Sequence, residues 1–194
     1  MRKQKTFTCI LLSVLLFCAG CSSSTKSSDH ADTSSADEFT QKYILTRFYG
    51  SESDRDEWIK EKEDEDVQHN IAYDQTSDSI TVTASLTQAQ YWVKKAEDEI
   101  EQNALAISKD DNYSISVNAT DTQMTITSSS GWNLKHLQKT VDEDLLAMEI
   151  HQVFSGISSW HIDVDVVNEE TGEKVKSFSL PDDDLVLNDS IWQS

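Results

Sequence analysis

Glycine is scarce in this chain, with five residues among 194, which excludes a glycine-rich phosphate-binding loop. The Gly-x-Ser-x-Gly motif of serine hydrolases is absent as well. Cysteine occurs three times, at positions 9, 18 and 21. A globular domain formed by the rest of the chain therefore has neither a disulfide nor a cysteine nucleophile. It has to be stabilised by the burial of apolar side chains, for which about 150 residues are sufficient.

Basic residues are also few, because 16 lysines and arginines stand against 35 acidic residues, giving a formal net charge of -19. This charge argues against nucleic acid as a partner, since phosphate groups are bound by lysine and arginine. It also argues against a domain that lies flat on anionic lipid. A cationic partner or a divalent ion is compatible with the charge.

The beginning of the chain has the pattern of an export signal. Arg2, Lys3 and Lys5 precede a largely apolar run over residues 7–18. This run is shorter than the ~18 or more apolar residues of a membrane-spanning helix. Basic residues before such a run and small residues after it are typical of a secretory signal peptide.

The residues that follow the run, Cys18-Ala19-Gly20-Cys21, resemble the lipobox of bacterial lipoproteins, with Cys18 at the place where leucine is usual. The resemblance implies cleavage before Cys21, a diacylglycerol thioether on its sulfur and often a further N-acyl chain. Two or more acyl chains anchor a protein stably to a membrane. The alternative is an ordinary secretory signal that is cut near Gly20 and leaves Cys21 free. Without the leader, 13 basic and 35 acidic side chains remain, a formal charge of -22.

The composition divides the chain into four parts. Residues 1–20 form the predicted lipoprotein signal peptide, and residues 21–38 comprise the lipidated cysteine and a flexible tether rich in serine, threonine and aspartate. Residues 39–180 are predicted to form a single globular domain. Residues 181–194 form an acidic tail that either docks on the domain or stays mobile.

Two copies of a strand-strand-helix pattern dominate the domain. Alternating apolar and polar residues predict strands over residues 43–49, 67–74, 79–85, 113–119, 124–127, 160–166 and 174–180. Apolar stripes with helical spacing predict long helices over residues 87–107 and 133–154, and a short solvated helix is predicted over residues 51–66. The first strand segment also suits a helix that begins at Asp37. His69 shares the apolar parity of its strand, which is typical of a rim or core histidine.

Helix starts are indicated by capping patterns. Ser53 with Asp56 suits the start of the short helix, and Thr87 with Gln90 forms a capping box for the first long helix. Asn133 is the expected N-cap of the second. Short turns predict antiparallel hairpins, and alternation indicates a sheet with one covered face. We therefore predict an α+β two-layer sandwich, in which two long helices pack on one face of an antiparallel sheet.

The acidic segment over residues 50–61, GSESDRDEWIKE, stands before the first strand-strand-helix unit. In this combination the chain is similar to small uncharacterised lipoproteins of Gram-positive bacteria. The resemblance implies no activity. The segment itself is interpreted either as a solvated helix or as a face that binds ions or a partner.

The strongest metal candidates are His161, Asp163 and Asp165, which share one face of a predicted strand. Alternate residues on a strand are about 6.5–7 Å apart, too far to converge easily on one ion, so a polar solvent face is the competing interpretation. The run of three aspartates at 182–184 is not an EF-hand loop, because Leu187 occupies the sixth position, where that loop requires glycine. A hydroxyl-rich open sheet face is a further candidate contact surface.

No catalytic set stands out from these patterns. We therefore predict a non-enzymatic lipoprotein without a cofactor, anchored through Cys21 on the extracytoplasmic face of the cell membrane. Its domain would bind another envelope or extracellular component, either a protein or a glycan. The alternative is a metal-dependent or hydrolytic extracytoplasmic enzyme that uses the acidic open sheet face.

Overall fold

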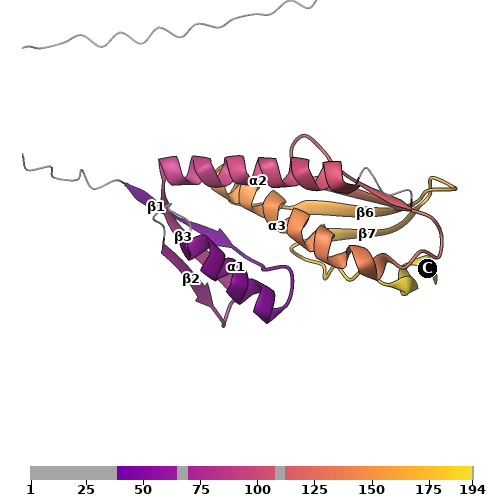
Figure 1. Cartoon of the computed structure of the whole chain (residues 1–194), viewed down its shortest axis with the longest axis horizontal. Coiled ribbons are helices and arrows are strands. Elements are labelled where there is room, and N and C mark those ends of the chain that lie inside the picture. Colours follow the sequence, from indigo (N-terminus) through magenta and orange to yellow (C-terminus); the bar gives the residue numbers. More distant parts are fainter. Residues whose placement is uncertain (1–38, 65–69, 108–111, 194) are drawn as a thin grey trace, which may run out of the picture. The chain divides into compact units, whose positions relative to one another are not determined.

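A computed structural model describes residues 39–64, 70–107 and 112–193, and these ranges contain seven strands, three α-helices and two short 3-10 helices (Figure 1). The strands are β1 (Thr40–Leu45), β2 (Asn70–Asp74), β3 (Ser79–Ser85), β4 (Tyr113–Val117), β5 (Gln123–Ser128), β6 (Ile162–Asn168) and β7 (Lys174–Leu180). The helices are α1 (Glu52–Asp64), α2 (Leu86–Ile107), α3 (Gln138–Phe154), η1 (Leu134–Leu137) and η2 (Asp189–Gln193). The predicted signal peptide and tether, Cys21 and His69 lie outside the described residues.

The described strands form two sheets. The first has the order β1-β3-β2 and is antiparallel throughout, and the second has the order β4-β5-β6-β7. In the second sheet the hairpins β4-β5 and β6-β7 are antiparallel, whereas β5 and β6 pair in parallel. The predicted α+β class is confirmed, but two features differ from expectation: the strands are divided between two sheets, and one pairing is parallel.

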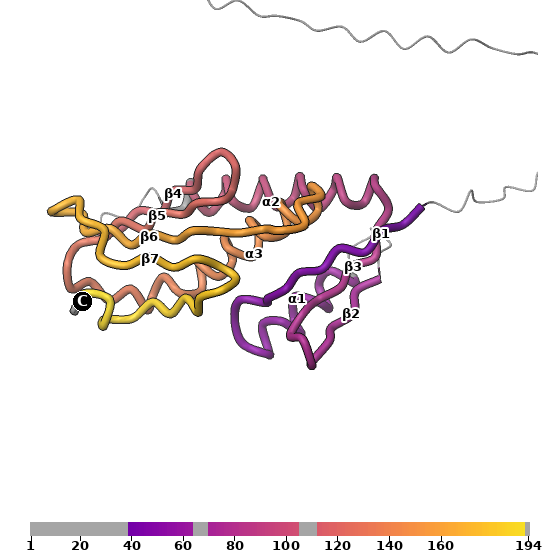
Figure 2. The backbone as a smooth tube through the Cα atoms, turned by 180° about the vertical axis from the view of Figure 1, so that it is seen from behind, coloured from indigo at the N-terminus to yellow at the C-terminus, as the bar shows by residue number. Residues whose placement is uncertain are grey.

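The helices between the strands explain both differences. With 22 residues, α2 is about 33 Å long and carries the chain away from β3, so that β4 begins a second sheet (Figure 2). Between β5 and β6 the chain passes through η1 and α3. A crossover of this length returns the chain in its original direction, which a short turn cannot do, and the two strands therefore pair in parallel.

The two long helices pack against each other and are shared by both sheets. Helix α2 contacts β3 and β4, and helix α3 contacts β1 and β6. The predicted apolar stripe of the second long helix is buried: Leu145 and Met148 are fully enclosed. A row of stacked and tilted aromatic rings ties the first sheet to the three α-helices, with centroid distances of 4.4 Å for Tyr43–Phe154, 5.0 Å for Phe154–Trp92 and 5.7 Å for Trp92–Trp58.

Two predicted helix starts are wrong by two residues. The Oγ of Ser51 accepts from the N–H of Asp54, and the Asp54 carboxylate accepts from the N–H of Ser51, so Ser51 is the cap of α1 in place of Ser53. Ser85 and Gln88 make the same reciprocal pair at the start of α2, in place of Thr87 and Gln90. For α2 the reason is that β3 continues into the helix without a loop, so that the last strand residue serves as the N-cap.

Asn133 caps a helix, but not the predicted one: its Oδ1 accepts from the N–H of Lys135 at the start of the 3-10 helix η1. The long helix α3 begins only at Gln138, and its N-cap position, Leu137, makes no side-chain hydrogen bond. The first strand ends four residues earlier than predicted. Leu45 pairs with Ile80 near the start of β3, so the chain beyond Leu45 has no partner strand and becomes a loop. That loop carries Phe48 and Tyr49 towards α1 and α3.

The C-terminal segment packs onto the domain. Leu185, Leu187 and Ile191 are buried, and the indole N–H of Trp192 donates to the carbonyl of Trp132. Of the two interpretations of the acidic tail, docking is therefore the one that the described residues show. Among those residues, no helix combines the length and the apolar character needed to cross a membrane.

Candidate binding groove

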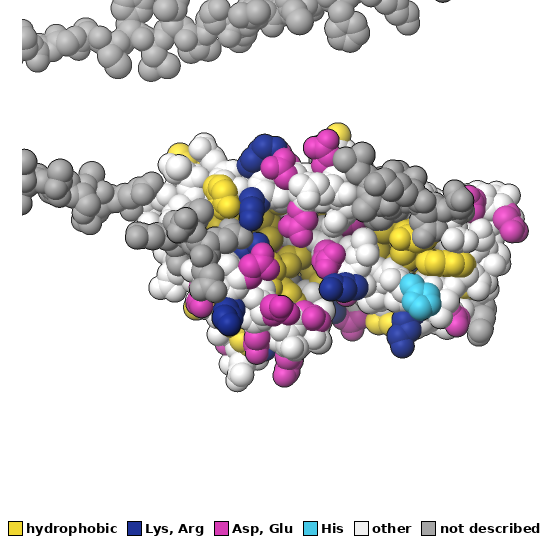
Figure 3. All heavy atoms as spheres, viewed as in Figure 1, with side chains coloured by type: hydrophobic (Ala, Val, Ile, Leu, Met, Phe, Trp, Pro, Cys, Tyr) yellow, Lys and Arg dark blue, Asp and Glu magenta, His cyan; other side chains and the backbone are white. Residues whose placement is uncertain are grey.

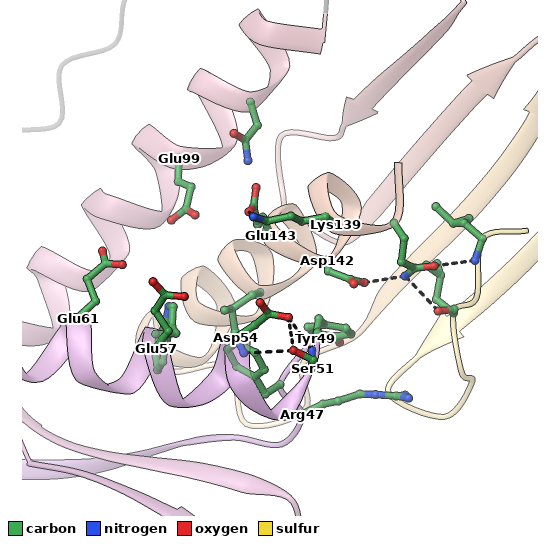
Figure 4. A pocket seen from close by; sticks show the side chains of 18 of the residues that line it. Arg47, Tyr49, Ser51, Asp54, Glu57, Glu61, Glu99, Lys139, Asp142 and Glu143 are labelled. Carbon is green, nitrogen blue, oxygen red and sulfur yellow. Dashed lines mark hydrogen bonds and ion pairs between the residues drawn. The ribbon is translucent and has the colours of Figure 1, made fainter. Parts of the chain in front are cut away.

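A groove with a cavity volume of about 1540 Å³ lies among the three α-helices. Its walls are α1, residues 95–103 of α2, residues 138–146 of α3, the loop at residues 47–51 and the C-terminal residues 185–188. The ribbon close-up in Figure 4 shows the side chains that these elements contribute. Figure 3, drawn in the same view as Figure 1, shows acidic and apolar side chains next to one another on this face.

Part of the lining is apolar. Phe48 and Trp58 are half-buried and stand 6.0 Å apart between ring centroids. Leu146 of α3 and Leu187 of the C-terminal segment are buried along the groove, and Val186 is 55% exposed at its edge. Apolar and aromatic side chains with a few charged groups among them are the usual composition of a binding site.

Acidic side chains from three helices surround the same space. Glu57 and Glu61 are four residues apart and share a face of α1. Figure 4 shows their carboxylates, together with Glu99 of α2 and Glu143 of α3, around the opening of the groove. Seven acidic side chains line the groove against five basic ones, so this surface is negative.

The surroundings shift the pKa values of three of the lining carboxyls. Desolvation raises the pKa of Asp142 to about 6, although the Gln138 amide donates to its Oδ1 from 2.8 Å. Desolvation also raises the pKa of Glu99. At the other end, hydrogen bonds from the Ser51 side chain and backbone lower the pKa of Asp54. A nearby positive charge would therefore stabilise the ionised forms of Asp142 and Glu99 more than that of Asp54.

The C-terminal wall is fixed by two side chains. Gln138 accepts from the N–H of Leu187 at 2.8 Å and donates to the carbonyl of Leu185 at 3.4 Å. Arg47 donates to the carbonyl of Asp183 at 3.0 Å and forms an ion pair with Asp184. These contacts join residues far apart in sequence and attach the C-terminal segment to α3 and to the loop after β1.

Behind the groove lies a buried carboxyl on α3. Glu149 is fully buried, and its Oε1 accepts from the N–H of Thr46 at 2.6 Å and from the Thr46 hydroxyl at 3.2 Å. The indole N–H of Trp160 in turn donates to that hydroxyl at 3.0 Å. Burial raises the pKa of Glu149 to about 8, and burial also raises the pKa of Tyr49, whose ring lines the groove.

The metal candidates of the sequence do not form a metal site. Asp163 and Asp165 both lie on β6, where each accepts a hydrogen bond from a serine of β7, Ser179 and Ser177, at 2.8 and 2.7 Å. Asp165 also pairs with Lys174 at 2.7 Å. His161 lies just before β6 and is exposed. Within the described ranges, no group of three histidine, cysteine or carboxylate side chains is placed to hold a metal ion.

The hydroxyl-rich face is divided by the fold. Thr81 and Thr83 belong to the first sheet, while Ser114 and Thr125 belong to the second. Ser85, at the end of β3, is buried as the cap of α2. The predicted continuous open face is therefore absent from the described strands.

Of the groove, the sequence indicated only the acidic segment over residues 50–61, whose Asp54, Glu57 and Glu61 form part of one wall. The other walls come from separate segments that no local pattern brings together. Two buried acids on α3 were missed as well, Asp144 and Glu149, which are 2% and 0% exposed. A signal for Asp144 was present: it stands three residues after Val141 and four before Met148, inside the apolar stripe.

The comparisons with known proteins identify no relative of this chain. No family model matches the chain, and neither the curated proteins nor the solved structures contain a match. The functional interpretation therefore depends on the residues of the groove and on the pattern at the beginning of the chain.

Proposed function

We propose that this protein is an exported, non-enzymatic lipoprotein that binds a polypeptide of the cell envelope or the extracellular space in its groove. The groove among α1, α2 and α3 is the observation that carries the proposal. At about 1540 Å³ it exceeds the ~300–1,000 Å³ of sites for small molecules, which favours a larger ligand.

The lipobox pattern supports the location. Cleavage before Cys21 and lipidation of its sulfur would place residues 39–193 on the extracytoplasmic side, attached to the membrane through the segment at 22–38. A binding partner in the same compartment would then need no membrane attachment of its own.

Polypeptide is favoured over glycan by the groove lining. Phe48, Trp58 and Val186 offer apolar surface beside several carboxylates. Such a mixture matches a chain that carries both apolar and charged side chains, and aromatic residues are enriched where proteins bind one another.

Site-directed photo-crosslinking on intact cells tests the proposal. A benzophenone amino acid is placed at Val186 or Gln102 in the groove, or at Ser116 or Ser177 on the second sheet as controls; all four positions are exposed. The full lipidated chain is used throughout. We expect a discrete adduct from the two groove positions and none from the sheet positions.

A pair of matched variants makes the test specific. Val186→Ser removes exposed apolar surface from the groove without adding charge, and Ile157→Ser does the same elsewhere, at a position that is 44% exposed. The Gln102 adduct should be weakened by Val186→Ser and kept with Ile157→Ser. Adducts that form only from the sheet positions, or equally from all four, would show that the groove is not the binding surface.

A further inference from the structure

We infer that the ligand segment is cationic and amphipathic, with lysine or arginine side chains that lie between the carboxylates of α1 and α2. This inference rests on the proposed function and specifies the chemistry of its ligand. The partner is a polypeptide segment with one basic and one apolar side, because the groove offers both kinds of surface.

The first argument is charge complementarity. Within the described ranges, Glu57 and Glu99 have no lysine or arginine within ion-pair distance, although both line the groove. Three of the basic lining residues are already engaged: Arg47 holds the C-terminal segment, Lys62 lies 3.4 Å from Glu61, and Lys139 lies 3.8 Å from Glu143. The groove therefore has negative charge left for a ligand.

The second argument is the cost of that negative charge in the free protein. Glu57 and Glu61 lie one turn apart on α1, where like charges repel, and the ion pair of Glu61 with Lys62 at 3.4 Å compensates one of the two charges. Glu99 faces the same space from α2, and desolvation raises its pKa even though the charges of Lys62 and Lys95 act in the opposite direction. A cationic side chain placed among these groups would offset both effects, which a neutral or acidic ligand would not do.

The third argument concerns the apolar wall. Phe48, Trp58 and Val186 lie along the loop, the helix and the C-terminal segment that border the carboxylates. Aromatic rings beside carboxylates also suit a cation, since the face of an indole attracts ammonium and guanidinium groups. The Nζ of Lys62 already lies 6.0 Å from the centroid of the Trp58 ring.

A second copy of this chain is a poor occupant by the same criterion. Its 35 acidic residues outnumber its 16 basic ones, and the C-terminal segment, residues 181–194, contains no lysine or arginine. A metal ion is not favoured either, because the described residues hold no suitable cluster.

Peptide binding to the full lipidated protein in an uncharged detergent tests the inference, with empty micelles as the blank. The probes are a fluorescent 18-residue helix of leucine and lysine and its glutamate counterpart with the same leucine pattern. Fluorescence anisotropy gives the dissociation constants. We expect the lysine peptide to bind and the glutamate peptide to bind at least about tenfold more weakly, since two groove carboxylates lose their partners.

Charge variants locate the effect. Glu57→Gln with Glu99→Gln should weaken binding of the lysine peptide about five- to tenfold. Glu170→Gln with Glu173→Gln, in the exposed turn after β6, changes the net charge equally and should alter binding less than twofold. Circular dichroism confirms that both double variants are folded.

Three outcomes would overturn the inference. Equal weakening by both double variants would indicate attraction to the overall charge of the protein. Equal binding of the two peptides would show that the groove does not select positive charge. A cross-linked adduct at Val186 with twice the mass of the chain would identify a second copy as the occupant. In the first two cases, groove-specific adducts with another protein would still support the proposed function.

Discussion

Thr46 and Glu149 are 103 residues apart in the sequence, and the backbone N–H of Thr46 lies 2.6 Å from Oε1 of Glu149. This contact joins the residue after β1 to the C-terminal half of α3. The carboxyl is fully buried, and its second oxygen has no hydrogen-bond partner among the described residues. A proton on that oxygen removes the cost of a buried negative charge.

The stability of the protein should therefore depend on the protonation of Glu149. Burial raises its pKa from 4.5 to about 8, so the folded state binds this proton more tightly than the unfolded chain. The contribution is complete below about pH 4.5 and is lost as the pH rises through about 8. Between pH 7 and pH 9 we expect the free energy of unfolding to fall, by on the order of 1 kcal/mol.

Urea unfolding at the two pH values measures this change. Glu149→Gln keeps an oxygen that accepts from Thr46 but cannot ionise, so its free energy of unfolding should be nearly the same at pH 7 and pH 9. Asp142 and Asp144, with pKa values raised to about 6, are largely ionised throughout this window. An undiminished decline in Glu149→Gln would show that another group is responsible.

Ser85 should stabilise the protein as the N-cap of α2. Its Oγ accepts from the N–H of Gln88, and Oε1 of the Gln88 side chain accepts from the N–H of Ser85 at 2.7 Å. We expect Ser85→Ala to lower the free energy of unfolding by about 1 kcal/mol. Thr87→Ala, at an exposed position in the first turn, is the matched control and should cost less than about 0.5 kcal/mol. A larger loss of stability in Thr87→Ala than in Ser85→Ala would show that Thr87 is the N-cap, as the sequence pattern predicted.

We expect divalent metal ions not to bind the acidic residues of β6. Asp165 is occupied by Lys174 and Ser177, and Asp163 by Ser179. A divalent ion would have to displace these partners, so we expect Zn²⁺, Ca²⁺ and Mn²⁺ to leave the melting temperature where it is. A rise in melting temperature that Asp165→Asn abolishes would favour the metal-dependent alternative.

Cys21 should determine attachment to the membrane. We expect the wild-type chain to incorporate a palmitate label in growing bacteria and to sediment with membranes. Cys21→Ala should lose the label and either keep its leader or appear in the medium. Cys18→Ala leaves the small residues and the modified position intact, and it should remain labelled. Incorporation of palmitate by Cys21→Ala would contradict the lipobox assignment.

Much of the fold followed from local patterns, because periodicity reports which side of an element is buried. The bounds of β3, residues 79–85, were predicted from the alternation of apolar and hydroxyl side chains, and the end of α3 at Phe154 followed from its apolar stripe and Gly156. Gly156 has a φ of +89°, a conformation that glycine adopts without strain.

The arrangement of the sheets did not follow, because strand alternation reports a buried face but not the neighbour across the ladder. Parallel pairing of β5 with β6 is set by the intervening helix, and the division into two sheets by the length of α2. Apart from the acidic segment that forms one of its walls, the groove could not be predicted either, for a related reason. Its surface depends on contacts such as Arg47 with Asp183 and Gln138 with Leu187, which no local spacing reveals.

Hydrogen exchange measured by mass spectrometry on the protein in its native membranes, compared with the purified lipidated protein, tests the binding groove most directly. Occupancy of the groove predicts slower exchange in the native membranes for α1, for residues 95–103 of α2 and for residues 185–188, with β4 to β7 unchanged. Slower exchange confined to β4 to β7, or identical exchange throughout the chain, would contradict a ligand in the groove.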